Sequence, residues 1–271
     1  MSAPSRMSGL PTRIATALAI GVAFLAAILY GHALGLGVLL AVVAVLAASE
    51  FYTITRRESR LPNEVFGLVA VFAMPLSAAL WGVEGLAGTV ATLVAASLVW
   101  HLAFKRVSAT DTAVTVFGAV YVGFSLAHLV LIRGFAGGWG LTLATVVSVW
   151  ANDVFAYAVG ASLGKHRLAP HISPNKTWEG FAAGTVFTVG VWIVVGLVEP
   201  TFSLAGHALV GVAVSIAAVV GDLAESRLKR EAGIKDSGTR LPGHGGFLDR
   251  FDSLIMVSLV TYYLLLLAGA R

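Results

Sequence analysis

Long apolar stretches dominate this chain, and its few charged residues fall mostly between them. Reading for runs nearly free of Asp, Glu, Lys and Arg gives nine segments of roughly the 20 residues that a helix needs to cross a hydrocarbon core. They are residues 14–31, 34–50, 65–82, 86–104, 113–132, 141–163, 179–198, 206–225 and 253–269. No alternating strand pattern appears, which argues against a membrane β-barrel. The pattern predicts an all-α, polytopic membrane protein with about nine transmembrane helices.

The composition supports this prediction. Of the 271 residues, 58% are hydrophobic and 12% are charged, whereas a soluble domain carries about 25% charged residues. The chain has no cysteine, which excludes disulfides and thiolate metal sites. The uncharged run from Ile14 to Ser49 is too long for the apolar core of a cleavable signal peptide, so we interpret it as two retained helices.

The basic residues lie almost wholly in alternate loops. If the N-terminus is cytoplasmic, nine helices place every one of the 18 Lys and Arg residues except Arg133 and Arg271 in cytoplasmic loops. Cytoplasmic loops are enriched in these residues. The pattern therefore predicts a cytoplasmic N-terminus and a C-terminus on the outer side of the cell inner membrane. The net charge of +4 reflects topology, and we expect no nucleic-acid partner.

Polar residues within or beside apolar segments gather in the later part of the chain. Such residues are costly in a membrane and usually functional. We therefore expect residues 1–110 to form a scaffold, open to lipid or dimer contacts, in which Glu50 is an interfacial residue at a helix end. Residues 111–271 should form the catalytic region, with cytoplasmic loops at 164–178 and 226–252. The sequence leaves a homodimer open.

The sixth apolar segment carries Asn152 and Asp153. Asp153, Tyr157 and Gly160 are spaced to share one helix face. Because a bare Asp in hydrocarbon costs at least about 2.5 kcal/mol, we expect this face to line a polar cavity. The alternative is a hydrogen bond between helices.

The segment from Ser173 to Gly180 precedes another apolar helix. Pro174 should make a rigid turn, and Thr177 is a candidate N-cap. The free N–H groups and the positive dipole end of such a helix suit a phosphate, and Lys176 adds a positive charge. The alternative is an ordinary basic flank followed by a cap.

The densest polar stretch runs from Gly221 to Ser253. Asp222, Glu225 and Ser226 share one helix face, and Asp249 and Asp252 repeat the three-residue spacing at the start of the last helix. Two carboxylate sets on neighbouring helices would make the all-oxygen site that Mg²⁺ prefers. We expect Mg²⁺ there and leave a second cation open.

The residues between these carboxylates suit a polyphosphate. The loop carries several cations and glycines, which respectively neutralise phosphate charge and allow close backbone approach: Lys229, Arg230, Lys235, Arg240, Arg250, Gly243, Gly245 and Gly246. Carboxylates for a metal together with cations for phosphate indicate phosphoryl or nucleotidyl transfer. His244 could serve as a phosphate donor or as a hydrogen-bonding partner within the loop. The alternative for the whole stretch is a solvated cytoplasmic loop.

The stretch from Ser226 to Asp252 resembles the signature of the phosphatidate cytidylyltransferase (CDP-diacylglycerol synthase) family. The matching residues are Ser226, Lys229, Arg230, Lys235, Asp236, Gly238, Leu241, Pro242, His244, Gly245, Gly246, Phe247, Asp249, Arg250, Phe251 and Asp252. Ser173, Pro174, Lys176, Thr177, Glu179 and Gly180 resemble a second segment of that family, and Asp153, Tyr157 and Gly160 a third. The resemblance is strong over about residues 150–255 and only architectural before that.

The resemblance implies the reaction of CTP with phosphatidate to give CDP-diacylglycerol and pyrophosphate, at a site facing the cytoplasm. The implied catalytic residues are Asp222, Asp249, Asp252 and Lys176, and the implied metal ligands are Asp222, Asp249, Asp252 and Glu225. The implied substrate-binding residues are Asn152, Asp153, Ser173, Asn175, Lys229, Arg230, Lys235, Asp236, Arg240, His244, Gly245, Gly246 and Arg250.

Two other functions compete with this one. A CDP-alcohol phosphotransferase would carry a motif that begins Asp-Gly-x-x-Ala-Arg and ends with Asp-xxx-Asp spacing, and neither occurs here. A transporter could use Asp153 and Asp222 as a proton or cation relay. It would not need the glycine-rich loop together with the Asp249–Asp252 segment.

Overall fold

The computed structural model describes residues 10–57, 61–238, 240–241 and 245–270. Of the residues named above, Pro242, Gly243, His244 and Arg271 lie outside the described part of the chain.

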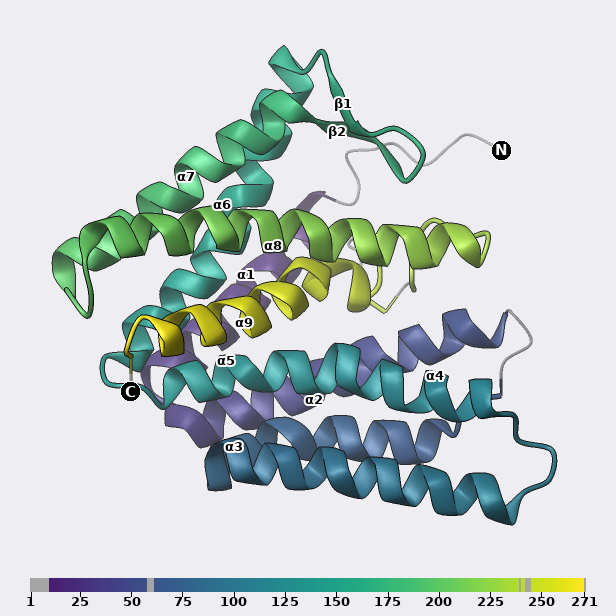
Figure 1. Ribbon diagram of the computed structural model, residues 1–271. Coiled ribbons are helices and arrows are strands. Elements are labelled where there is room, and N and C mark those ends of the chain that lie inside the picture. Colours follow the sequence, from purple (N-terminus) through teal and green to yellow (C-terminus); the bar gives the residue numbers. More distant parts are fainter. Residues whose placement is uncertain (1–9, 58–60, 239, 242–244, 271) are drawn as a thin grey trace.

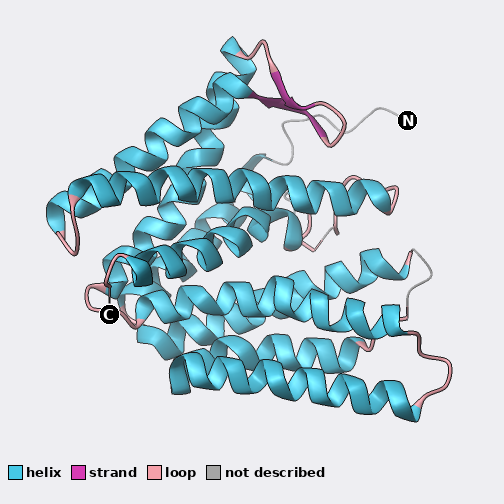
Figure 2. Ribbon diagram, in the orientation of Figure 1, coloured by secondary structure: helices cyan, strands magenta, loops and turns pink. Residues whose placement is uncertain are grey.

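The described chain is helical apart from one pair of short strands (Figure 2). The helices before the strands are α1 (Leu10–Leu29), α2 (His32–Arg56), α3 (Glu64–Ala103), α4 (Ala109–Ala119), the π-helix η1 (Val120–Phe124), α5 (Ser125–Arg133) and α6 (Gly138–Leu163). The strands β1 (Arg167–Ala169) and β2 (Ser173–Thr177) are followed by α7 (Trp178–Val198), α8 (Leu204–Glu231) and α9 (Leu248–Leu267). The chain is an all-α, multi-pass membrane protein.

Helix α3 folds back on itself at Gly82. This residue has φ 62° and ψ −144°, a backbone conformation that glycine adopts without steric cost. The Thr89 hydroxyl consequently donates a hydrogen bond to the Ser77 hydroxyl, at 2.9 Å, although the two residues would lie about 18 Å apart along a straight helix. The two halves match the predicted segments 65–82 and 86–104.

Successive apolar segments run back and forth through the molecule (Figure 1). Among the described residues, seven helices are long and apolar enough to cross a membrane, α4 to α5 counting as one and α3 as one, while residues 15–29 of α1 form a shorter apolar helix. The loops predicted to be cytoplasmic lie toward the right of Figure 1, opposite the end of α9. The number of crossings and the side that each terminus occupies remain predictions.

The two loops expected to carry the chemistry are more structured than the sequence suggested. Helix α8 continues to Glu231, so the α8–α9 loop spans residues 232–247 and not 226–252. Ion pairs four residues apart, Glu225 with Lys229 and Arg227 with Glu231, support the extra turns. Within the predicted 164–178 loop, β1 and β2 pair antiparallel. The predicted cap is confirmed, since Gly180 N donates to Thr177 Oγ1 at 3.1 Å.

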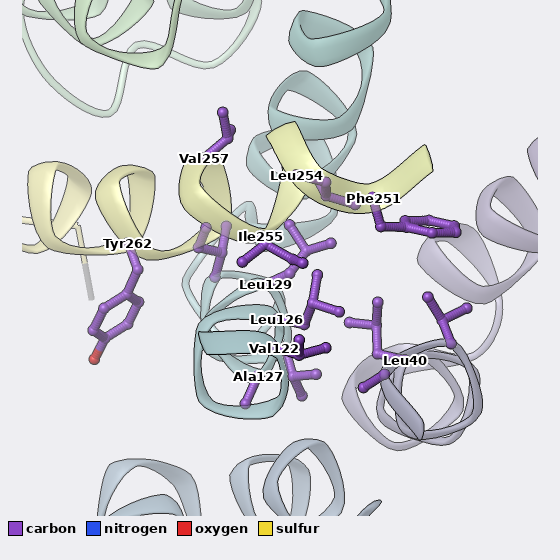
Figure 3. Close-up of a cluster of buried hydrophobic side chains, with 14 of the residues drawn as sticks. Leu40, Val122, Leu126, Ala127, Leu129, Phe251, Leu254, Ile255, Val257 and Tyr262 are labelled. Atoms are coloured by element: carbon purple, nitrogen blue, oxygen red, sulfur yellow. The ribbon is translucent and has the colours of Figure 1, made fainter. Parts of the chain in front are cut away.

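The apolar core joins α2, α5 and α9. Figure 3 shows Leu40 of α2, Leu126 of α5 and Ile255 of α9 directed toward one another. Helix α8 packs on the other side of α9 and against α7, which in turn packs on α6. Many large apolar side chains on the outer helix faces are exposed, as expected for surfaces that contact lipid. This packing brings α8 and α9, the two carboxylate-bearing helices, side by side.

Candidate functional site

Lys176 and Asp222 form an ion pair between β2 and α8. Lys176 Nζ lies 2.6 Å from Asp222 Oδ2, and the two side chains are 24% and 29% exposed. Asp222 Oδ1 also accepts a hydrogen bond from Ser226 Oγ at 3.2 Å, as their shared helix face predicts. The strand pair therefore brings the predicted phosphate-binding lysine to the predicted metal-binding helix.

Lys229 is a buried cation between two carboxylates. Its Nζ lies 2.6 Å from Glu225 Oε2 and 2.7 Å from Asp249 Oδ1, and Glu225 is fully buried. A buried lysine is costly unless it is paired, so this position ties α8 to the start of α9. Lys229 thus neutralises the site internally and does not extend toward solvent as a loop cation would.

Asp249 organises the α8–α9 loop. Besides Lys229, its carboxylate accepts hydrogen bonds from Ser237 N at 3.0 and 3.1 Å and from Gly246 N at 2.9 Å. A carboxylate offers about four lone-pair positions, so most of the capacity of Asp249 is used within the protein. These bonds hold both ends of the loop close to α9.

Asp252 lies among other carboxylates. Its oxygen accepts a hydrogen bond from Ser253 N at 2.6 Å, and it interacts electrostatically with Asp222, Glu225 and Asp153. Within the described residues, no three His, Asp or Glu side chains are grouped closely enough to form a metal site by themselves. Mg²⁺ usually takes only one or two carboxylates and completes its shell with waters and substrate phosphates. Asp222 and Asp252, on adjacent helices, fit that pattern.

An apolar groove of about 770 Å³ leads to these charges. It lies between α1, α6 and α9, with walls formed by side chains such as Phe24, Val146 and Leu254. Asp153, Asp249, Arg250 and Asp252 also line it. Of the helix face predicted to line a polar cavity, Asp153 lies in this mainly apolar groove, whereas Tyr157 and Gly160 are not part of its lining. The groove places hydrocarbon-compatible walls beside a cluster of charged groups.

The other predicted residues of α6 and the strand pair differ in their surroundings. Asn152 is buried, and its Oδ1 accepts a hydrogen bond from Ser215 Oγ at 2.9 Å. This contact serves the packing of α6 against α8, the alternative that had been considered for its neighbour Asp153. Ser173 is half-buried at the start of β2, while Asn175 is exposed. Neither lies in the groove lining.

The remaining predicted cations, Arg230, Lys235 and Arg240, are exposed. Arg230 is exposed and donates to the Ile234 carbonyl at 3.0 Å, which closes the end of α8. Lys235 and Asp236 are exposed in the α8–α9 loop. Arg240 is exposed and bonds the Ser49 hydroxyl of α2. Gly245 has φ 86°, a conformation that favours glycine.

Helices α2 and η1 contribute two residues, Glu50 and Tyr121, that were not among the predicted site residues. The interpretation of Glu50 as an interfacial helix-end residue is wrong: Glu50 is 3% exposed and hydrogen-bonded to the α8–α9 loop. A lone carboxylate within an apolar run was the available signal. Tyr121, in η1, has a buried hydroxyl that finds no hydrogen-bond partner among the described residues, and it interacts electrostatically with Asp222, Glu225 and Asp252. π-Helical turns often occur at functional sites.

The arrangement of these residues could bind three kinds of chemical group. The Lys176 ammonium can bind phosphate. The carboxylates of α8 and α9 can hold a divalent cation. The groove can accept hydrocarbon. A reaction between a polyphosphate and a lipid would use all three.

Comparison with known proteins agrees with this chemistry. Residues 11–268 match the Cytidylyltransferase family. The chain is 44% identical over 155 residues to the phosphatidate cytidylyltransferase of Bacillus subtilis (strain 168), covering 55% of this chain and 56% of that protein. It is 40% identical over 146 residues to the phosphatidate cytidylyltransferase of Brucella abortus, covering 54% of each. With the phosphatidate cytidylyltransferase of Mycobacterium tuberculosis the identity is 39% over 160 residues, covering 58% of this chain and 48% of the other. The chain thus spans about half the length of the curated relatives that it matches.

Proposed function

Because the chain belongs to the Cytidylyltransferase family, we propose that it is a phosphatidate cytidylyltransferase. Such an enzyme converts CTP and phosphatidate into CDP-diacylglycerol and pyrophosphate at the membrane. The relatives with which the chain shares 39 to 44% identity carry that name.

The observation that carries the proposal is the meeting of the apolar groove with the charged cluster. The groove supplies walls for acyl chains, and its lining includes Asp153, Arg250 and Asp252. Asp153 interacts electrostatically with Asp222 and Lys176, so a lipid lying in the groove would direct its headgroup toward that ion pair. An enzyme acting on a soluble acceptor would not need apolar walls at this point, so the geometry favours a lipid phosphate as the second substrate.

The proposed reaction is a displacement at phosphorus. A phosphatidate oxygen forms a new bond to the α-phosphorus of CTP, while the bond from that phosphorus to the bridging oxygen breaks. The bridging oxygen keeps the electron pair and leaves with pyrophosphate. The attacking phosphate is largely dianionic near pH 7, since its second pKa is about 6. The reaction therefore needs alignment and charge neutralisation more than a strong general base.

The residues of this chain divide that work in our proposal. Lys176, now paired with Asp222 at 2.6 Å, would exchange that carboxylate for a phosphate oxygen. Arg250, in the groove lining, and Arg240, in the α8–α9 loop, would add positive charge. Asp222 and Asp252 would hold Mg²⁺, which when bound would neutralise phosphate charge. Lys229 would keep Asp249 in place through their 2.7 Å ion pair.

Incorporation of label from CTP into lipid tests the proposal. Purified protein in mixed micelles would receive [α-³²P]CTP, Mg²⁺ and phosphatidate, and chloroform-soluble label would be measured. We expect label in a product that migrates as CDP-diacylglycerol, with release of one pyrophosphate per product.

Parallel reactions would replace phosphatidate by diacylglycerol, or CTP by ATP, and we expect little product from either. Equal labelling with diacylglycerol would contradict the proposed attack by a lipid phosphate. An absence of product with phosphatidate, in protein shown to be folded, would exclude the proposed reaction altogether.

A further inference from the structure

Glu50 is a buried carboxylate at the point where α2 reaches the α8–α9 loop. Its neighbours on the helix, Ala47, Ala48 and Phe51, are buried as well. A carboxylate in such surroundings is costly unless its oxygens receive hydrogen bonds. The bonds that Glu50 receives therefore matter to the fold at this point.

Glu50 is bonded to both ends of the α8–α9 loop. Its Oε2 accepts hydrogen bonds from Ser237 Oγ at 2.8 Å and from Leu248 N at 2.9 Å. Ser237 lies within the first half of the loop, and Leu248 directly follows the loop. One side chain, from a helix about 190 residues earlier in the sequence, thus holds these two points of the chain close together.

The contact with Leu248 also caps α9. Leu248 is the first residue of that helix, and the N-cap residue Phe247 offers no side-chain cap. The first N–H groups of a helix lack partners within the helix, and its N-terminus carries partial positive charge. The Glu50 carboxylate supplies both an acceptor and a negative charge at this end, across the interface between two helices.

The position of Glu50 requires glycine at two places in the loop. A Cβ atom on Gly246 would overlap Glu50 Oε2 and the Ser237 hydroxyl, and one on Gly238 would lie 2.7 Å from Glu50 Oε1. Real Cβ atoms do not approach other atoms so closely. From the sequence, Gly246 was expected to allow close approach of a ligand. In the structure Gly246 and Gly238 permit close approach of the loop to α2.

The same loop residues also contact the candidate site. Ser237 bonds Glu50 through its hydroxyl and Asp249 through its backbone N–H. Gly246, in van der Waals contact with Glu50, donates its N–H to Asp249 at 2.9 Å. A shift of the loop on the Glu50 side would therefore change the hydrogen bonds of Asp249, and through them its pairing with Lys229.

We propose that Glu50 is a positioning residue, which holds the α8–α9 loop in the geometry that binds the phosphates of the nucleotide. The same end of α2 also holds Arg240, which donates hydrogen bonds to the Ser49 hydroxyl and the Leu46 carbonyl. Helix α2 therefore positions both the Arg240 side chain and the backbone of the loop. This role rests on the proposed function, since it assumes a nucleotide whose phosphates lie against the loop.

Kinetics and hydrogen exchange together test the role of Glu50. In Glu50→Ala we expect the KM for CTP to rise about tenfold, the scale of one lost hydrogen bond to a charged group, with smaller changes in kcat and in the KM for phosphatidate. A general loss of stability would lower the active fraction without this selective change. Glu50→Gln keeps an oxygen acceptor and should recover most of the affinity. Glu64→Gln, which removes a carboxylate paired with Arg56 at 2.9 Å away from the loop, is the matched control.

Hydrogen exchange tests the support of the loop by Glu50 without relying on enzyme activity. Peptides covering residues 234–250 should exchange faster in Glu50→Ala than in the wild type, and Glu50→Gln should restore protection. If exchange rises as expected but the wild type does not use CTP, the loop support stands and the proposed function fails. If exchange is unchanged, or the KM for CTP is unchanged in an active enzyme, the positioning role is refuted.

Discussion

Replacing Lys229 by methionine tests whether the buried ion-pair network holds the site together. Methionine keeps most of the apolar stem of lysine and deletes its charge. The change leaves the carboxylates of Glu225 and Asp249, now 2.6 and 2.7 Å from Lys229 Nζ, without their shared cation. Within the described part of the chain, the Glu225 oxygens have no well-aligned hydrogen bond apart from this ion pair. Glu225 is fully buried, so the lost partner is not replaced by bulk water.

The size of the effect follows from this burial. Removing one partner of a buried ion pair costs about 3–5 kcal/mol, because an uncompensated charge remains in a poorly solvated position. With a melting shift of about 2–4 °C per kcal/mol for chains of this size, Lys229→Met should melt roughly 6–20 °C below the wild type. The Ser237 and Gly246 bonds to Asp249 would remain, so the helices themselves should still form.

Two companion variants separate charge from packing. Glu225→Gln leaves the pair of Lys229 with Asp249 intact and should cost only about 1 kcal/mol, the net value of a typical hydrogen bond. The double variant Lys229→Met, Glu225→Met removes the stranded carboxylate together with the cation. It should therefore be more stable than Lys229→Met alone, which is non-additive behaviour expected of residues in contact.

The assay is thermal unfolding in detergent or nanodiscs, followed by intrinsic fluorescence, with all variants in one buffer. Our reasoning would be refuted if Lys229→Met melted with the wild type, or if the double variant lost the sum of both single effects. Either result would mean that the carboxylates do not depend on Lys229.

Three further predictions concern the site and the topology. Lys176→Ala should lower kcat/KM by an amount equivalent to about 2–4 kcal/mol of transition-state stabilisation, as for a lost oxyanion donor. Lys176→Arg should recover only part of that loss, because the guanidinium is larger and planar. Wild-type kinetics for the alanine variant would mean that Lys176 serves only as a basic residue that orients the chain in the membrane. Asp252→Asn should abolish turnover with Mg²⁺ while leaving the melting temperature near that of the wild type, and near-native turnover would remove Asp252 from the metal assignment. Reporter fusions after residue 271 and within residues 232–247 should report opposite sides of the membrane, and finding both on one side would overturn the predicted nine-helix topology.

The helices could be predicted from the sequence because their signal is local. An apolar run of about 20 residues has few alternatives to a helix in a membrane, where each backbone N–H and C=O must be paired internally. The break at Gly82 and the cap at Thr177 were predictable for the same reason, since each depends on a few adjacent residues. The extension of α8 to Glu231 was missed because charged residues were assigned to a loop, although i,i+4 ion pairs can keep them helical.

The sequence predicted only those features of the site that lie within a single segment of the chain. The pairing of Lys176 with Asp222 agrees with the expectation that both serve one site, but its geometry depends on the packing of β2 beside α8. The role of Asn152 in joining α6 to α8 could not be separated from substrate binding, because a polar residue in an apolar helix suits either. Which helices become neighbours is a property of tertiary packing, and a single sequence does not encode it in any local pattern.

The predicted division into a scaffold before residue 110 and a catalytic region after it leaves out what the first two helices contribute to the candidate site. Helix α1 supplies one wall of the groove, including Phe24, and α2 supplies Glu50 at the α8–α9 loop. Helices α8 and α9 carry the charged residues, but without α1 the groove would lack a wall, and without α2 the start of α9 would lack its cap. The early helices therefore complete the candidate site at two points, one on the lipid side and one on the loop side. Substitutions at Phe24 and Glu50 should accordingly affect different substrates, the first phosphatidate and the second CTP, and that separation follows from where each helix contacts the site.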